Sequence, residues 1–216
     1  MTQDRHSIVT LLGAGPVSHG DIEEILLRAP RLVAADGGAA AALAAGAVPE
    51  RVIGDFDSLP HSVRDILPEG AFLHVAEQES TDFEKCLTRI DAPLILALGF
   101  TGGRADHELS VYNALVRVPA PPCIVLGEHD LVFRAPRAFE LELQPGHRVS
   151  LFPMGPVSGT SSGLRWPIDG LHFAPDGRVG TSNEATGPVS LTFDADCMLV
   201  IMPRLALELS IRALLG

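Results

Sequence analysis

The sequence predicts an N-terminal Rossmann-like open α/β domain followed by a C-terminal antiparallel β-sandwich. In the first part of the chain, short apolar runs alternate with stretches of helical spacing. The run Leu94–Leu98 is apolar throughout, which suits a parallel strand buried on both faces. Over residues 130–202, short alternating runs are separated by turns rich in Pro and Gly, a pattern typical of an antiparallel sandwich or barrel. We therefore expect two domains, residues 1–128 and 129–216.

Composition limits the classes of protein to which the chain can belong. Of its 216 residues, 46% are hydrophobic and 20% are charged, which fits a globular protein with a substantial core. The formal net charge of −11 argues against nonspecific binding to nucleic acid or to acidic membranes. No apolar run approaches the length of a membrane span, and residues 1–12 do not read as a signal peptide. The 3 cysteines are odd in number and far apart, which suits a reduced, cytoplasmic location.

The expected elements of the first domain follow from periodicity and from Gly and Pro positions. Strands are expected at Ser7–Leu12, Arg31–Ala35, Val52–Ile53, Phe72–Val75, Leu94–Leu98 and Cys123–Leu126. Helices are expected at Asp21–Arg28, in the Ala-rich stretch up to about Gly46, at Ser62–Leu67, from Thr81 onward, and from about Glu108 to Val116.

In the second domain the strands are shorter and the turns more frequent. Strands are expected at Phe139–Leu143, Arg148–Phe152, Val189–Phe193 and Cys197–Met202. The tail Leu205–Leu215 has helical spacing and could pack on either domain or on a partner.

Two carboxylates, Asp55 and Asp57, follow the expected strand Val52–Ile53 directly. At a separation of about 5 Å they would repel by about 3 kcal/mol at an effective dielectric of about 20. Mg²⁺ would remove this repulsion, since it prefers carboxylate oxygens. The alternative is an Asp-rich turn in which Asp57 or Ser58 caps a short helix. Asp36, which follows Arg31–Ala35, is likewise either a ligand-facing residue at the edge of the sheet or a helix N-cap.

The segment Gln78–Lys85 combines a capping box with two further charges. Thr81 and Glu84 form the box, so a helix should begin at Thr81. Asp82 and Lys85 are three residues apart and share one face of the first turn, where they could hold a metal and a phosphate side by side. Lys85 is the only lysine among 16 Lys and Arg residues, which indicates that a compact ammonium is needed there. The alternative is a solvated ion pair contributing less than about 1 kcal/mol.

A third polar loop follows the strand Leu94–Leu98 and contains Gly102, Gly103, Arg104, Asp106 and His107. The glycines let a ligand approach the backbone, and an arginine can grip a phosphate bidentately. The spacing is not that of a Walker P-loop. A capped tight turn is the alternative, but three polar loops at one sheet edge favour a ligand-binding wall.

The order of these motifs resembles the thiamin pyrophosphokinase family. The matching pieces in the first domain are Asp36-Gly37-Gly38-Ala39, Gly54-Asp55-Phe56-Asp57-Ser58, Thr81-Asp82-Phe83-Glu84-Lys85 with Gln78 upstream, and Gly102-Gly103-Arg104-Ala105-Asp106-His107. The second domain matches through Gly163-Leu164-Arg165-Trp166-Pro167 and Thr181-Ser182-Asn183-Glu184. The resemblance implies a homodimer with active sites between subunits. It also implies transfer of the pyrophosphoryl group of ATP to the hydroxyl of thiamin, with Mg²⁺, giving thiamin diphosphate and AMP.

The resemblance also implies roles for individual residues. The catalytic set would be Asp55, Asp57, Asp82 and Lys85, with the three aspartates holding the metal. The ATP and phosphate set would be Asp36, Gln78, Thr81, Gly102, Gly103, Arg104, Asp106 and His107. The thiamin set would be Trp166, which would stack on the pyrimidine, with Ser182 and Asn183. Two departures stand out: Val111 occupies a position where many members have Asn, and Arg165 one where Lys is common.

Alternatives in other classes remain open at this stage. A pyrophosphokinase for another alcohol, such as a hydroxymethyl pterin, would share the first-domain motifs and differ around Trp166. A non-catalytic nucleotide or thiamin sensor would not need Asp55, Asp57, Asp82 and Lys85 together. A phosphatase of the haloacid dehalogenase type would carry its DxD on the first strand, which this chain does not.

Overall fold

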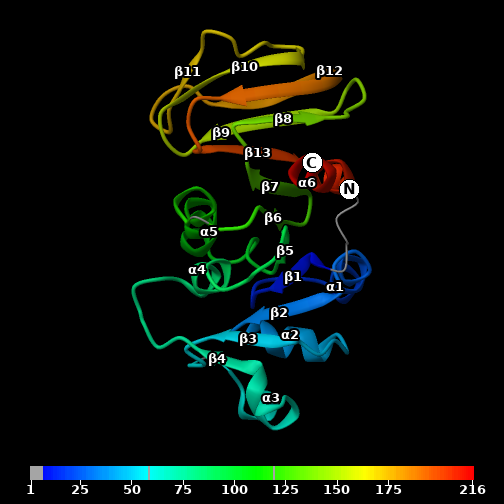
Figure 1. The fold of residues 1–216 in the computed structure, drawn as a ribbon, viewed down its shortest axis with the longest axis vertical. Coiled ribbons are helices and arrows are strands. Elements are labelled where there is room, and N and C mark those ends of the chain that lie inside the picture. The colour runs from blue at the N-terminus through cyan, green and yellow to red at the C-terminus, as the bar shows by residue number, and fades with distance from the viewer. Residues whose placement is uncertain (1–6, 58, 119) are drawn as a thin grey trace. The chain divides into compact units, whose positions relative to one another are not determined.

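The computed structural model describes residues 7–57, 59–118 and 120–216. The chain forms two compact units, Met1–Ala114 with Val118–Glu128, and Leu115–Arg117 with His129–Gly216. The first is a parallel α/β unit and the second an antiparallel β unit (Figure 1), so the fold class predicted from the sequence is confirmed.

The first unit is built on a parallel sheet with the strand order β6-β5-β1-β2-β3-β4. Its strands are β1 (Val9–Leu12), β2 (Arg31–Ala35), β3 (Arg51–Gly54), β4 (Phe72–His74), β5 (Ile95–Leu98) and β6 (Cys123–Leu126). Every residue of β1, β5 and β6 is buried, as expected for parallel strands covered on both faces. The chain builds outward from β1 to β4 and then returns to β5 on the other side of β1. The strand order therefore reverses at β1, the position at which open α/β sheets bind ligands.

The helices of this unit connect successive strands (Figure 1). They are α1 (His19–Leu26), α2 (Gly38–Ala44), α3 (His61–Ile66), a 3₁₀ turn (Glu69–Ala71), α4 (Asp82–Leu87) and α5 (Ala105–Arg117). Capping boxes begin two of them, Ser18 with Asp21 at α1 and Thr81 with Glu84 at α4. The expected helix start at Thr81 is therefore confirmed. The helix expected from about Glu108 to Val116 is present as α5, which begins about one turn earlier, at Ala105.

The second unit contains antiparallel strands throughout. They are β7 (Asp130–Arg134), β8 (Ala138–Leu141), β9 (Arg148–Pro153), β10 (Val157–Leu164), β11 (His172–Phe173), β12 (Gly180–Phe193) and β13 (Met198–Pro203). β7, β10 and β11 were not individually expected. β10 reads Val-Ser-Gly-Thr-Ser-Ser-Gly-Leu, a composition with weak strand preference, and it is held as a strand by its pairing with β12.

The long strand β12 belongs to two sheets. Its first part, Gly180–Glu184, pairs with β9, which continues through β13 to β7. Its second part pairs with β10 on one side and β8 on the other. Phe133 of β7 and Phe139 of β8 meet edge to face with ring centroids 6.0 Å apart. The two sheets therefore pack against each other through apolar inner faces, as in a β-sandwich.

The C-terminal tail packs within the second unit. A 3₁₀ turn (Arg204–Ala206) leads into α6 (Leu207–Leu215), and this helix contacts β8. Leu207 and Ile211 are buried one turn apart on the helix. The helical expectation for the tail is thus confirmed, and the element on which it packs is identified.

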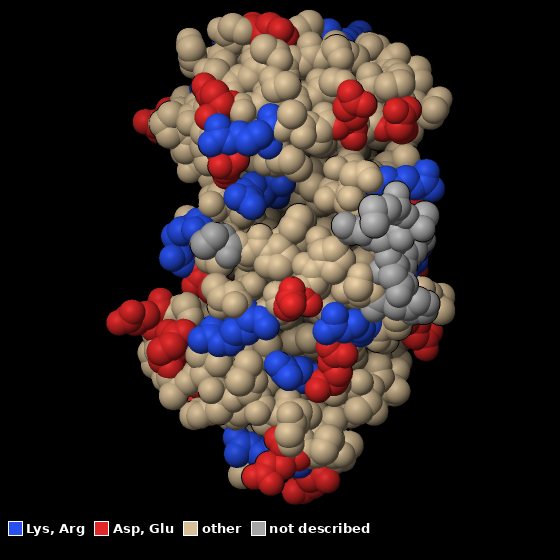
Figure 2. Space-filling model, viewed as in Figure 1, with Lys and Arg blue, Asp and Glu red and all other residues tan. Residues whose placement is uncertain are grey.

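The surface charges and the helix lengths concern two classes that the composition argues against, proteins that bind nucleic acid or acidic membranes nonspecifically and proteins that span a membrane. On the face drawn in Figure 2, acidic and basic side chains lie interspersed in small groups. Among the described residues, no helix combines the length and the apolar character needed to cross a membrane.

The start of α2 offers a test of how closely that helix approaches the sheet. A Cβ added to Gly38 would lie 2.1 Å from the backbone oxygen of Leu12. Because a backbone oxygen cannot move aside as a side chain can, we expect Gly38→Ala to lower the free energy of unfolding by about 2 kcal/mol or more. Chemical denaturation measures this difference. Gly70→Ala is the matched control, since an added Cβ there meets nothing within 4 Å. Equal stability of the two variants would contradict the close approach.

Candidate active site

The loops at the reversal of strand order are joined by backbone hydrogen bonds. The Gly13 N–H donates to the Leu98 carbonyl and the Gly15 N–H to the Gly99 carbonyl, each at 2.8 Å. The turn after β1 and the turn after β5 therefore form one continuous edge of the sheet. The loop after β5 continues into Gly102, Gly103 and Arg104 and then into α5.

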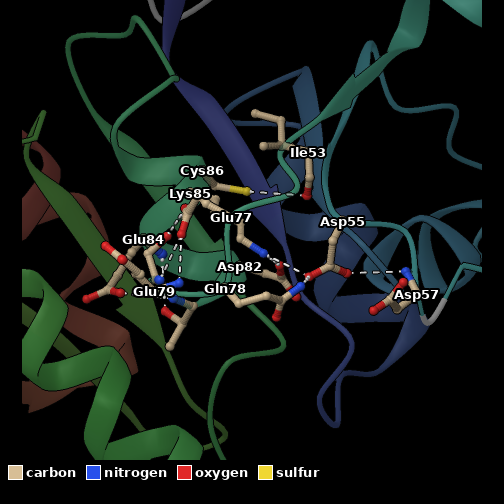
Figure 3. A network of polar contacts seen from close by, with 12 residues as sticks. Ile53, Asp55, Asp57, Glu77, Gln78, Glu79, Asp82, Glu84, Lys85 and Cys86 are labelled. Carbon is tan, nitrogen blue, oxygen red and sulfur yellow. Dashed lines mark hydrogen bonds and ion pairs between the residues drawn. The ribbon is translucent and has the colours of Figure 1, made fainter.

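The loop after β3 places Asp55 and Asp57 in different environments, because Asp55 is partly buried and Asp57 is exposed. The Asp55 Oδ1 accepts a hydrogen bond from the Asp57 backbone N–H at 3.2 Å. Phe56, between them, has a φ of 66°, a left-handed conformation that is uncommon outside glycine. Figure 3 shows the Asp55 side chain between Lys85 on one side and Asp57 on the other. Asp55 therefore faces Lys85, while Asp57 is exposed and contacts Asp55 through its backbone N–H.

Phe56 anchors the loop to the body of the first unit. Its ring meets Phe72 edge to face at 5.6 Å and lies 5.5 Å from the His74 ring. The Arg64 guanidinium lies 5.8 Å from the centroid of the Phe56 ring and donates to the Phe56 carbonyl at 3.1 Å. The middle residue of the Asp-Phe-Asp motif is thus packed among aromatic rings, which holds the neighbouring aspartates in place.

Lys85 is the centre of the polar cluster (Figure 3). Its Nζ donates to Asp55 Oδ2 at 2.9 Å and to Asp82 Oδ1 at 3.1 Å, and its side chain is only 2% exposed. The alternative of a solvated ion pair is therefore wrong. Burial by itself lowers the pKa of Lys85, but the two carboxylates outweigh it and raise that pKa above its ordinary value. The hydrogen bond from Lys85 is in turn the main reason why the pKa of Asp55 is lowered.

Two further contacts hold this cluster together. Gln78 Nε2 donates to Asp55 Oδ2 at 3.2 Å. The loop that carries Gln78 is shaped by Glu77, whose carboxylate accepts from the backbone N–H groups of Glu79 and Ser80. On the other side, Cys86 Sγ contacts the Ile53 carbonyl at 4.0 Å and so joins α4 to β3.

Asp36 lies at the end of β2, next to the Asp55 loop in the sheet. It is 4% exposed and has a φ of 38°. N-capping is excluded as its role, because α2 begins with Gly37 as its N-cap and has no side-chain cap. Asp36 is thus a buried carboxylate at the sheet edge where the other motif residues gather.

The loop before α5 carries the exposed charges of the motif set. Arg104 and Asp106 pair in a bidentate manner, at 3.1 and 2.5 Å, and their side chains are 70% and 63% exposed. Glu108 accepts from the Gly102 N–H at 2.9 Å and from the Tyr112 hydroxyl at 2.7 Å, so it ties the glycine turn to α5. His107 is exposed on the first turn of the helix.

The donor chemistry of the cluster can be compared with the needs of a metal ion. Within residues 7–57, 59–118 and 120–216, no three His, Cys, Asp or Glu side chains are grouped so that together they could hold a metal. Asp55 and Asp82 nevertheless converge on one cation, the Lys85 ammonium. Mg²⁺ is usually bound by one or two carboxylates together with substrate phosphates. The pair of carboxylates therefore fits Mg²⁺ that is bound jointly with a phosphate-bearing ligand.

The second unit contains the Trp166 loop. Trp166 is 53% exposed, so this lone tryptophan does not fill the core of the β unit. The Arg165 guanidinium lies 4.9 Å from the centroid of the indole, and Arg165 Nη1 is 3.4 Å from Glu184 Oε1. Ser182 is exposed with a φ of 62°, and its N–H donates to Ser150 Oγ at 2.9 Å. Asn183 is buried and bonded to the Trp166 backbone.

The structure thus sorts the residues that the sequence singled out. Asp55, Gln78, Asp82 and Lys85 form one hydrogen-bonded cluster, with Thr81 capping the helix that carries two of them. Arg104 and Asp106 pair with each other, while Trp166, Ser182 and Asn183 gather in the second unit. Sequence reasoning missed the supporting residues Arg64, Glu77 and Glu108. Only Glu108 has a sequence signal, an acidic residue in the first turn of a helix that follows a glycine loop.

Comparison with known proteins finds a matching family domain in each of the two units. The chain matches the model of the thiamin pyrophosphokinase catalytic domain over residues 22–125 and that of the thiamin pyrophosphokinase vitamin B1 binding domain over residues 138–198. Thiamine pyrophosphokinase 1 of Oryza sativa subsp. japonica is 32% identical over 178 residues, which cover 72% of this chain and 67% of the relative. The thiamine pyrophosphokinase of Bacillus subtilis (strain 168) is 27% identical over 164 residues, covering 70% and 77%.

Solved structures share the fold. Thiamin pyrophosphokinase from Candida albicans superposes with a TM-score of 0.76 at 17% identity, covering 92% of this chain and 89% of that chain. Yeast thiamin pyrophosphokinase gives a TM-score of 0.76 at 19% identity, covering 94% and 88%. At these identities the likeness concerns the fold.

Proposed function

The chain belongs to the thiamin pyrophosphokinase family, and we propose that its buried Lys85–Asp55–Asp82 cluster is the centre of the reaction. The reaction transfers the pyrophosphoryl group of ATP to the hydroxyl of thiamin, giving thiamin diphosphate and AMP. The single observation that carries the proposal is the buried ammonium between two carboxylates at the end of β3 and the start of α4. The match to a vitamin B1 binding domain favours thiamin over a pterin alcohol as the acceptor.

Phosphoryl-type transfer needs charge neutralisation and alignment more than covalent catalysis. We assign Mg²⁺ to Asp55 and Asp82, the two carboxylates that the structure brings together. The family resemblance adds Asp57 as a third ligand, whose carboxylate would turn toward the ion when it binds. The ion would neutralise phosphate charge and align the reacting oxygens. Lys85 keeps Asp55 ionised and holds the two carboxylates side by side. Gln78 restrains Asp55 from the opposite loop. The cluster therefore enters the reaction already ordered, which reduces the cost of reorganisation.

We assign the remaining members of the nucleotide set to the ATP and phosphate site around this centre. Arg104 holds an exposed carboxylate, Asp106, which it can exchange for a phosphate at small cost because surface ion pairs are weak. Asp36, which is buried at the end of β2, would lie at the bottom of the ATP site. Gly102, Gly103 and His107 would complete the phosphate loop before α5.

The second unit supplies the acceptor site in this proposal, with Trp166 stacking on the thiamin pyrimidine and Ser182 and Asn183 beside it. Two observations support this role: the indole is exposed, and Arg165 lies over one of its faces. We also propose a homodimer with active sites between subunits, as the family resemblance implies. A cytoplasmic location is supported by the three cysteines, which are all unbridged.

The metal assignment can be tested by neutralising each carboxylate of the Asp-Phe-Asp motif. We expect Asp55→Asn and Asp57→Asn to lower kcat at least about a hundredfold, as is typical when charge stabilisation is lost. Incubation with Mg-ATP and thiamin, with AMP separated from ADP, measures turnover and identifies the reaction. Asp65→Asn, an exposed carboxylate of α3, is the control. Wild-type kcat in either variant at saturating Mg²⁺ would contradict the assignment, and ADP instead of AMP would contradict the reaction.

Stability should separate the two aspartates. Asp55→Asn removes one of two carboxylates from a buried ammonium, so we expect it to cost about 1–3 kcal/mol. Asp57→Asn should leave the melting temperature unchanged, because that residue is exposed. A thermal melt compares them, and bound substrates should be absent because ligands stabilise the folded state.

Replacement of the lone lysine tests whether the ammonium has a special role. A guanidinium is larger and planar, and at a side chain that is 2% exposed it should displace Asp55 or Asp82. We expect Lys85→Arg to lower kcat/KM for ATP at least about tenfold, or about 1.4 kcal/mol. The reverse exchange Arg28→Lys, in an exposed pair with Glu24, is the control and should have no effect. Wild-type kinetics for Lys85→Arg would show that Lys85 has no special role in the reaction.

Trp166 tests the identity of the acceptor. Since it is the only tryptophan, thiamin that stacks on it should shift its emission saturably, whereas a hydroxymethyl pterin should not. We expect Trp166→Ala to raise the KM for thiamin far more than the KM for ATP, with little loss of stability because the indole is exposed. An unchanged thiamin KM would exclude the stacking role.

A further inference from the structure

The carboxamide of Asn183 makes three hydrogen bonds to the backbone of Trp166 and Glu184. Its Oδ1 accepts from the Trp166 N–H at 3.2 Å and from the Glu184 N–H at 2.9 Å. Its Nδ2 donates to the Trp166 carbonyl at 2.7 Å. Asn183 is 7% exposed, and an amide oxygen accepts two hydrogen bonds, so Oδ1 has no capacity left for a ligand.

These hydrogen bonds from the Asn183 side chain replace regular strand pairing at the end of β10, where that strand is irregular. Gly163 has a φ of 76°, and an added Cβ there would lie 1.9 Å from the Pro188 oxygen. The register between β10 and β12 shifts between Ser162 and Leu164. The Arg165 N–H still reaches the Glu184 carbonyl at 2.8 Å, but the next residue, Trp166, is held by the Asn183 side chain instead of by the ladder.

The neighbours of Asn183 fix it and orient the indole. Ser150 Oγ accepts from the Ser182 N–H at 2.9 Å, which stabilises the left-handed residue just before Asn183. Arg165 lies over the indole and is paired with Glu184. One face of the ring is therefore covered by a guanidinium, so a planar ligand has the opposite face on which to stack.

We propose that Asn183 is a positioning residue that acts through Trp166. It clamps both backbone polar groups of the tryptophan, so that the indole is presented to the acceptor ring before the ligand arrives. The inference rests on the proposed role of Trp166 in thiamin binding, and it gives Asn183 a role behind the indole instead of direct contact with the ligand. Because the clamp orders the site in advance, its loss should weaken acceptor binding and leave the chemical step unchanged.

The main test uses Asn183→Asp, which keeps the shape but places a carboxylate oxygen against the Trp166 carbonyl. In the absence of substrates, we expect lower fluorescence anisotropy of Trp166 and stronger quenching by acrylamide. We expect the KM for thiamin to rise about fivefold or more, with kcat and the KM for ATP nearly unchanged. Thr192→Val is the matched control, because it removes the Thr160–Thr192 side-chain bond between the same two strands. It should alter none of these quantities.

Two outcomes would overturn the proposal. A raised thiamin KM with unchanged anisotropy and quenching would mean that Asn183 contacts thiamin directly, and unchanged values of all these quantities would mean that it has no positioning role. If Asn183→Asp does not fold, hydrogen exchange of the wild type decides. The clamp requires the Trp166 amide to be protected both without and with thiamin, and an unprotected amide would exclude it.

Failure of the proposed thiamin role can be distinguished from failure of the clamp. If Trp166→Ala leaves the thiamin KM unchanged, while Asn183→Asp still mobilises the indole, the clamp stands and the stacking role is wrong. If Trp166→Ala raises the thiamin KM and Asn183→Asp mobilises nothing, the stacking role stands and the clamp is wrong.

Discussion

The buried ammonium of Lys85 is the interaction on which the catalytic unit depends. It joins Asp55, at the end of β3, to Asp82, at the start of α4, and it is almost completely removed from water. Burying a charge is costly, and the cost is offset only when the charge is well paired. Two carboxylates meet this condition, and Gln78 adds a hydrogen bond to Asp55. The sheet edge is thus held as a charged cluster instead of as separate mobile loops.

Backbone conformation supports the same residues. In the described part of the chain, the non-glycine residues with positive φ are Asp36, Phe56 and Ser182. All three lie in motifs that the sequence singled out. Such conformations cost about 1–3 kcal/mol each and persist where surrounding contacts enforce them, which is common at functional sites. For Phe56 the contacts are aromatic rings and Arg64, and for Ser182 the contact is a buried serine hydroxyl.

The two units order their polar residues by different means. In the first, charges on two neighbouring elements neutralise one another around Lys85. In the second, neutral side chains bond to backbone groups, as Asn183 does at Trp166, and leave an aromatic face exposed. A charged cluster suits a polyphosphate and a metal, whereas a fixed indole suits a flat heterocycle. This division agrees with the two family domains that the chain matches.

The sequence alone determined the fold class, the polar motifs and the start of α4, because these depend on local periodicity and on capping residues a few positions apart. Tertiary structure alone decided that Lys85 is buried, that Trp166 is exposed and that Asp55 pairs with Lys85. Each of these depends on elements distant in sequence. Asp55 and Lys85 meet across 30 residues, and Asn183 reaches Trp166 across 17. Neither periodicity nor spacing contains such pairings, since they arise only when β3 meets α4 and β12 meets β10.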